Sequence, residues 1–101
     1  MTDEETNLRE ALIAVNRRMV ALGLNRGRSG NLSARFEDHF LITPSGADPH
    51  AMGPDALVAM DFDGAVRGQG APSSEWRFHR DILVARPEIN VVLHAHPIFA
   101  T

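Results

Sequence analysis

Hydrophobic residues recur at spacings of three and four in the first part of the chain, at Leu8, Leu12, Val15, Met19 and Leu22. This spacing is typical of an amphipathic helix. Thr2 and Glu5 match a capping box, in which each side chain can bond to the other residue's backbone amide. Gly23 suits the position just after the end of a helix. The pattern therefore predicts a structural helix between Thr2 and Gly23.

Short apolar runs separated by turn residues occupy the middle of the chain and predict strands. We expect one hairpin around the Glu37-Asp38 turn and a second at the Asp63-Gly64 turn. Pro54-Asp55 is expected to open a single helical turn between them. The expected strands cover residues 31–36, 39–43, 57–62 and 65–66.

A second helix and a buried strand are expected in the last third of the chain. Ser73 or Ser74 can cap a helix that runs to about Ala85, because Arg86-Pro87 disfavours its continuation. The apolar run that follows predicts a buried strand over 89–94. Since the hairpin signals favour antiparallel pairing, the pattern indicates an α/β or α+β fold with helices on a mostly antiparallel sheet.

The composition limits the class of protein. A chain of 101 residues accommodates one small domain. It has no apolar run of the roughly 18–20 residues that span a bilayer, and its acidic N-terminus is unlike a secretory signal. There is no cysteine, which excludes disulfide scaffolds and zinc ribbons. These features favour a cytoplasmic protein that does not bind a membrane.

The charged residues narrow the chemistry further. The net charge is -3, with no basic stripe to suit nucleic acid. All ten basic residues are arginine, so no lysine is present to form a Schiff base. Tyrosine is also absent. An enzyme built from this chain would have to use histidine, carboxylates, arginine, hydroxyls and backbone amides.

His94-Ala95-His96 is the sharpest candidate for a functional site. Residues i and i+2 of a strand share a face, so the two imidazoles can hold one metal ion at a strand end. Without cysteine, the ligands would be imidazole and carboxylate, which suit zinc or another divalent first-row metal. The alternative is a pair of half-buried histidines whose hydrogen bonds are satisfied within the fold.

Ser73-Ser74-Glu75 is a second candidate, because hydroxyls and unpaired amides at a helix N-terminus can bind an anion. The simpler interpretation is a helix cap. His79 lies four residues after Glu75 on the same helix face and can be a ligand or orient the carboxylate. A core histidine bonded to backbone is the more usual case. His39 and His50 look like surface or loop residues.

Two glycine-containing polar loops, 27–31 and 43–46, flank the first expected hairpin. Glycine allows backbone amides to approach a phosphate closely. Neither loop matches a P-loop or a dinucleotide-binding fingerprint, so ordinary turns are the alternative.

Taken together, these segments resemble the class II aldolase/adducin family, which includes sugar-phosphate aldolases such as fuculose-phosphate aldolase. The matching pieces stand in the family's order and span about three quarters of the chain. They are Gly30-Asn31-Leu32-Ser33, Leu41-Ile42-Thr43-Pro44-Ser45-Gly46, Pro72-Ser73-Ser74-Glu75-Trp76, Arg86-Pro87 and Val92-Leu93-His94-Ala95-His96-Pro97.

The resemblance implies a layered α/β/α fold with a mostly antiparallel central sheet. It also implies a phosphorylated sugar substrate, a divalent metal (Zn²⁺ foremost) and a homotetramer in the full-length protein. Glu75 corresponds to the family's catalytic acid/base, and His94 and His96 correspond to two of its metal ligands. Arg28 departs from the family, which often has a small hydroxyl residue there. The phosphate site corresponds to Asn31, Ser45, Gly46, Ser73 and Ser74.

Family members continue well beyond this strand and supply a third metal histidine there. We therefore expect residues 1–101 to form a class II aldolase/adducin-like domain that is incomplete at its C-terminus, and to be inactive alone. The implied function is a metal-dependent aldolase that cleaves a ketose phosphate through a metal-bound ene-diolate. A metal would replace the imine that the lysine-free chain cannot form. The alternatives are an epimerase, dehydratase or decarboxylase on the same fold, or a non-catalytic adducin-like module or truncated remnant.

Overall fold

The structure is a computed structural model that describes residues 2–23, 30–46, 48 and 51–94. Helix α1 (Asp3–Ala21) forms where the hydrophobic spacing predicts it. Its N-terminus is capped as expected, because the Thr2 hydroxyl accepts a hydrogen bond from the Glu5 amide at 3.1 Å. Gly23 has a φ of +74°, a left-handed conformation that suits glycine just beyond a helix end.

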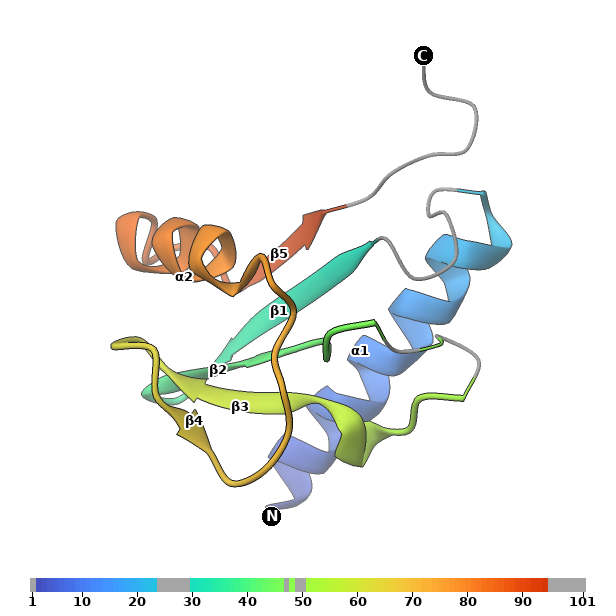
Figure 1. Cartoon of the computed structure of the whole chain (residues 1–101), viewed down its shortest axis with the longest axis horizontal. Helices are drawn as coiled ribbons and strands as arrows, with labels where there is room; N and C mark the ends of the chain where they lie inside the picture. The colour runs from blue at the N-terminus through green and yellow to red at the C-terminus, as the bar shows by residue number, and fades with distance from the viewer. Residues whose placement is uncertain (1, 24–29, 47, 49–50, 95–101) are drawn as a thin grey trace.

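Five antiparallel strands form one sheet, as Figure 1 shows. The order across the sheet is β4-β3-β2-β1-β5. Strand β5 therefore pairs with β1, although it comes last in the chain. The strands are β1 (Asn31–Phe36), β2 (His39–Ile42), β3 (Val58–Asp61), β4 (Val66–Arg67) and β5 (Val91–His94). The prediction of a mostly antiparallel sheet is confirmed.

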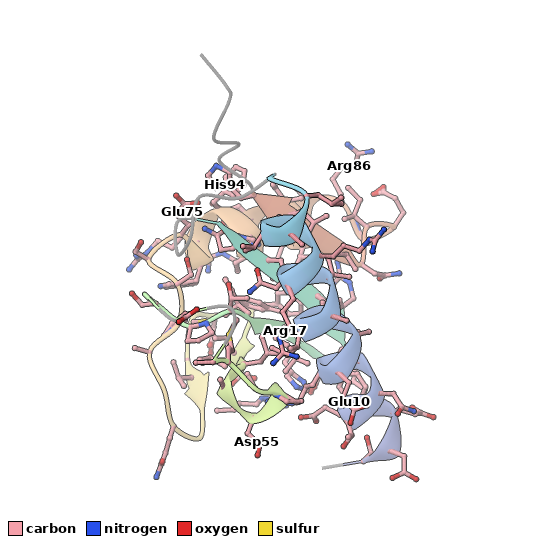
Figure 2. All side chains as sticks on the ribbon, turned by 90° about the vertical axis from the view of Figure 1, so that its right-hand side faces the viewer. Glu10, Arg17, Asp55, Glu75, Arg86 and His94 are labelled. Atoms are coloured by element: carbon pink, nitrogen blue, oxygen red, sulfur yellow. The ribbon has the colours of Figure 1, made fainter. Side chains whose placement is uncertain are left out.

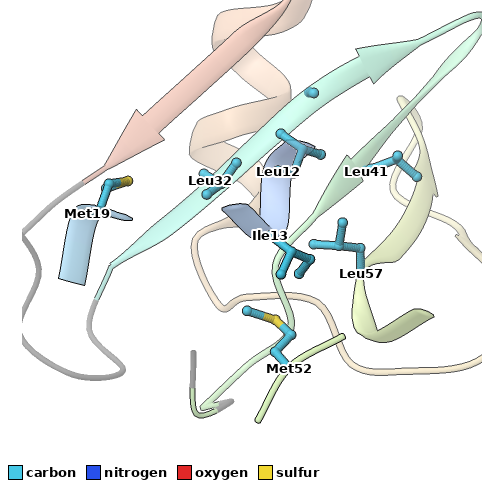
Figure 3. Close-up of a cluster of buried hydrophobic side chains, with 8 residues drawn as sticks. Leu12, Ile13, Met19, Leu32, Leu41, Met52 and Leu57 are labelled. Atoms are coloured by element: carbon cyan, nitrogen blue, oxygen red, sulfur yellow. The ribbon is translucent and has the colours of Figure 1, made fainter. Parts of the chain in front are cut away.

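One helix packs on each face of the sheet, which confirms the layered α/β/α architecture. Helix α1 covers one face together with the short helix η1 (Pro54–Ala56), and helix α2 (Trp76–Ala85) covers the other. Figure 3 shows the core on the α1 side, which contains Leu12, Ile13, Met19, Leu32, Leu41, Met52 and Leu57. The core on the α2 side contains Phe40, Ile42, Val58, Met60, Leu83 and Val92.

Strand β1 is buried on both faces, but the two faces differ in chemistry. Leu32 and Ala34 belong to the apolar core under α1. Ser33 and Arg35 bond to residues of α2, and Asn31 shares their face because side chains alternate along a strand. The α2 side of β1 is therefore lined by polar side chains.

Strand β5 differs from its prediction because only part of it is buried. It begins at Val91, since a turn occupies the residues before it and Ile89 N bonds to Arg86 O at 2.9 Å. Val92 packs against the α2 core, whereas Val91 and Leu93 are 47% and 52% exposed. The cause is the strand's position at the edge of the described sheet, where it pairs with β1 alone.

The expectation that His39 is a surface residue is wrong. His39 begins β2 and is only 6% exposed. Its ring packs edge-on against Phe36, and its Nδ1 lies 3.0 Å from Arg67 Nη1. Within the residues that the structure describes, no helix is both long and apolar enough to cross a membrane.

Candidate functional site

The candidate site lies at the end of the sheet where β1 begins and β5 ends. The register pairs Asn31 directly with His94, which brings the first residue of β1 beside the last residue of β5. Glu75 immediately precedes α2, which packs over the same two strands. Figure 2 shows Glu75 and His94 close together at this end of the molecule. Three segments that are distant in sequence thus supply one group of polar side chains.

Glu75 is the centre of this group. Its Oε2 accepts a hydrogen bond from the Asn31 side-chain amide at 3.2 Å and also contacts Nδ1 of His94. The side chains of His94 and Glu75 are 33% and 37% exposed, so a small molecule can reach both. Asn31 is 5% exposed and lies behind them. The site therefore has an accessible carboxylate and imidazole on a buried amide support.

His79 extends the group into the core. It is fully buried, with Nδ1 2.6 Å from the Ser33 hydroxyl and Nε2 against Oδ1 of Asn31. Burial lowers the pKa of His79 to about 4; Glu75 opposes this shift and His94 adds to it. The imidazole is therefore neutral near pH 7.

Two loops lie beside the group and beside each other. Pro44 and Pro72 form a bridge, and Ser45 N bonds to Ala71 O at 3.0 Å. The Ser45-Gly46 turn, in which Gly46 has a φ of +66°, therefore lies next to the segment that leads into α2. This arrangement brings two hydroxyl-bearing loops to the same end of the sheet.

The helix cap differs from its prediction in detail. Helix α2 begins at Trp76, and Glu75 rather than a serine occupies the cap position. The Ser73 hydroxyl instead accepts the Glu75 N–H at 3.2 Å, while Ser73 N bonds to Thr43 O at 3.0 Å. Ser73 is thus buried and its hydroxyl contacts the backbone of Glu75, whereas Ser74 is exposed.

The structure brings together Asn31, Glu75 and His94, as the sequence predicts for Glu75 and His94. His96, Arg28 and His50 lie outside the described residues. Within the described part of the chain, no group of three or more His, Cys, Asp or Glu side chains forms a metal site. The carboxylate and imidazole that do meet are a donor pair that suits zinc or a similar divalent ion, so the residues present fit part of such a site.

Sequence reasoning missed the polar contacts behind Glu75. His79 is a core histidine as expected, but its partners are the side chains of Ser33 and Asn31 rather than backbone. The sequence contains one pattern that indicates these contacts, which is the alternation of polar residues in a buried strand. Every second position is polar, at Asn31, Ser33 and Arg35. Such a pattern predicts a polar face that must find hydrogen-bond partners.

Comparisons with a family model and with individual proteins agree with each other. The family model described as "Class II Aldolase and Adducin N-terminal domain" matches residues 10–101. A 5-methylthioribulose-1-phosphate/5-deoxyribulose-1-phosphate aldolase from Rhodospirillum rubrum is 49% identical over 94 residues, which are 93% of this chain and 42% of that protein. An L-fuculose phosphate aldolase from Escherichia coli K12 is 38% identical over 98 residues, which are 97% of this chain and 46% of that protein.

Solved structures show the same likeness. An L-fuculose 1-phosphate aldolase superposes with a TM-score of 0.85 at 32% identity, covering 97% of this chain and 46% of its own. The Escherichia coli protein YgbL, whose description leaves open aldolase, epimerase or decarboxylase activity, gives a TM-score of 0.89 at 28% identity, covering 94% and 46%. The chain thus spans about half the length of the relatives it matches.

Proposed function

Because the chain belongs to the class II aldolase and adducin N-terminal domain family, we propose that it forms the N-terminal half of a metal-dependent sugar-phosphate aldolase. The reaction is the cleavage of a ketose phosphate into dihydroxyacetone phosphate, or a similar small ketone, and an aldehyde. The observation that carries the proposal is the meeting of Glu75, His94 and Asn31 at one end of the sheet. The aldolases that resemble this chain support it.

Glu75 is proposed as the acid/base of this reaction. A carboxylate that is about a third exposed can reach both a substrate proton and water, and the Asn31 amide and the Ser73 hydroxyl hold Glu75 from two sides. Positioned carboxylates of this kind typically accelerate proton transfer by about 10²–10⁴-fold. No lysine occurs in these 101 residues, so an imine with the substrate could not form on this half of the protein.

His94 and His96 are proposed as two metal ligands, with Zn²⁺ as the favoured ion. When bound, a divalent metal would polarise the substrate carbonyl and stabilise the charge that develops on it. The contact of His94 with Glu75 supports the assignment, because it puts an imidazole and a carboxylate within reach of one substrate. Catalytic zinc sites usually have three protein ligands, so a further ligand is expected from elsewhere in the protein.

The phosphate group is proposed to bind where the two loops meet. Asn31, Ser45, Gly46, Ser73 and Ser74 are the candidates for this site. The Pro44–Pro72 bridge supports the grouping, because it fixes the Ser45-Gly46 turn against the segment that precedes Ser73. Binding the phosphate at a distance from the reacting carbons would contribute binding energy that can be used at the bond to be cleaved.

A second candidate function keeps the site and changes the reaction. The likeness to YgbL favours an epimerase or decarboxylase acting through the same residues. A dehydratase is chemically related to both. A non-catalytic adducin-like module is disfavoured, since such a module would not need the Glu75–His94 pair at an accessible strand end. The homotetramer, the cytoplasmic location and the absence of membrane and nucleic-acid partners stay predictions.

The test compares Glu75→Gln with Glu88→Gln in the whole protein. Glu88 is an exposed carboxylate that pairs with Arg86 at 3.2 Å and serves as the matched control. It precedes the start of β5, whereas the site lies where β5 ends. With L-fuculose 1-phosphate and 5-methylthioribulose 1-phosphate as substrates, we expect Glu75→Gln to lower kcat by about 10²–10⁴-fold. The control should retain full activity.

Release of dihydroxyacetone phosphate and of the aldehyde is the measurement. An unchanged cleavage rate in Glu75→Gln would show that the base lies elsewhere. No cleavage of either substrate by the wild type, together with epimerised or decarboxylated product, would select the second candidate function.

A further inference from the structure

A chain of hydrogen bonds runs from the core to Glu75. It begins at the Ser33 hydroxyl, passes through both ring nitrogens of His79 and the side chain of Asn31, and ends at Glu75 Oε2. Ser33 and His79 are fully buried, and Asn31 is 5% exposed. Water therefore cannot readily replace the partners of the inner members, and each hydrogen must have one defined place.

The Glu75 carboxylate at the end of this chain determines which group donates and which accepts in every hydrogen bond. A carboxylate only accepts, so the amide nitrogen of Asn31 must face Glu75 and its carbonyl oxygen must face His79. A carbonyl oxygen also only accepts, so Nε2 of His79 must carry a hydrogen. The buried imidazole is neutral and carries a single hydrogen, so Nδ1 is the acceptor and the Ser33 hydroxyl donates to it.

We propose that His79 is a positioning residue, which as the Nε2–H tautomer holds the Asn31 amide in the orientation that donates to Glu75. Without this donor, the amide could rotate by half a turn and present its oxygen to the carboxylate. Two acceptors would then face each other, and Glu75 would move away. The catalytic part of this inference rests on the proposed function, whereas the tautomer and the amide orientation do not.

Two substitutions of His79 distinguish the contact at Nε2 from the contact at Nδ1. Glutamine reaches as far as Nε2 and can still donate to Asn31, whereas asparagine reaches only as far as Nδ1 and can keep only the Ser33 contact. We expect His79→Gln to retain kcat/KM within about tenfold of the wild type. His79→Asn should lose about a further ten- to hundredfold, mainly in kcat, because the released Asn31 amide would no longer donate its hydrogen bond to the charged Glu75.

A spectroscopic measurement on the wild type needs neither a variant nor a substrate. In protein labelled with ¹⁵N in its histidine rings, the nitrogen shifts of His79 near pH 7 should be those of the Nε2–H tautomer. The Nδ1–H tautomer or an imidazolium would overturn the proposal. Equal kcat/KM in the two variants would also overturn it, because a merely structural histidine has no preference for the Asn31 end.

The two proposals can fail separately. If the wild type cleaves no sugar phosphate but shows the Nε2–H tautomer, the proposed function fails and the amide orientation stands. If it is an active aldolase with the other tautomer, His79 is not the positioning residue.

Discussion

His79 lowers the free energy of unfolding at low pH, because burial keeps its imidazole neutral in the folded protein. Burial lowers the pKa of His79 from its ordinary value of 6.5 to about 4, so the unfolded chain binds a proton more readily than the folded one between these values. Above about pH 6.5 both states are neutral at this residue and the term vanishes. As the pH falls through this window, the free energy of unfolding decreases.

We expect this residue alone to lower the free energy of unfolding by about 3 kcal/mol once the pH reaches about 4. Urea unfolding of the whole protein, as wild type and as His79→Gln, at pH 7 and pH 4.5 is the measurement. Carboxylates titrate in both proteins, so the difference between their pH dependences isolates the histidine. The variant should lose less stability; an equal loss would show that His79 is not held neutral.

Helix α2 packs closely against the β3–β4 hairpin at its first residue, Trp76. Gly64 lies in the hairpin turn with a φ of +102°, and a Cβ there would lie 2.8 Å from Cη2 of Trp76. The guanidinium groups of Arg77 and Arg80 lie over the Trp76 ring, at 4.5 and 5.3 Å from its centroid. Because Trp76 directly follows Glu75, the hairpin also supports the start of the helix at the candidate site.

Gly64→Ala and Gly68→Ala form a matched pair of substitutions that tests the contact between the hairpin and Trp76. Both glycines have positive φ, at +102° and +86°, but a Cβ at Gly68 would meet no atom within 4 Å. Each change is expected to cost about 1–2 kcal/mol from backbone strain. Gly64→Ala should cost about 1–3 kcal/mol more, because the Trp76 ring must shift.

Thermal unfolding of the two variants in the whole protein measures the difference in stability. Gly64→Ala should also lower activity, since the ring shift reaches the residue next to Glu75, whereas Gly68→Ala should not. Equal losses of stability in the two variants would contradict a close fit between the hairpin and Trp76.

In the described part of the molecule, strand β5 exposes apolar side chains at an edge of the sheet. Val91 and Leu93 point away from α2 on edge strand β5, and both are about half exposed. On α1, Val15 and Leu22 are 40% and 57% exposed. An edge strand with exposed apolar side chains can pair with other chains, which favours aggregation. The relatives, which are about twice as long as this chain, have further residues that could cover such an edge.

We therefore expect residues 1–101, expressed alone, to unfold without a cooperative transition and to show no aldolase activity. A protein of this size buries only a modest fraction of its surface. The measurements are calorimetry, metal analysis and cleavage of L-fuculose 1-phosphate. The whole protein serves as the control. A sharp transition together with one bound metal per chain and turnover would show that this half is sufficient.

The sequence by itself determined the elements, because their signals are local. The spacing from Leu8 to Leu22 predicted α1. The predicted cap at Thr2 was confirmed by the hydrogen bond that its hydroxyl accepts from the Glu5 amide. Turn residues at 37–38 and 63–64 predicted both hairpins, since such residues favour tight turns between antiparallel strands. The first is a two-residue turn, whereas the second is one residue longer, because Asp61 N bonds to Ala65 O. Motif order was enough to indicate the family, and with it Glu75 and His94 as a pair.

Only the tertiary structure decided which side chains meet. The pairing of Asn31 with His94 depends on β5 joining β1 rather than another strand, and no local pattern specifies that choice. The same holds for His79, whose partners come from a strand 46 residues earlier. Its neutral state and its bond directions arise from burial and from the carboxylate at the far end of the hydrogen-bonded chain. Such long-range contacts follow from packing the whole sheet against α2, so residue spacing alone could not predict them.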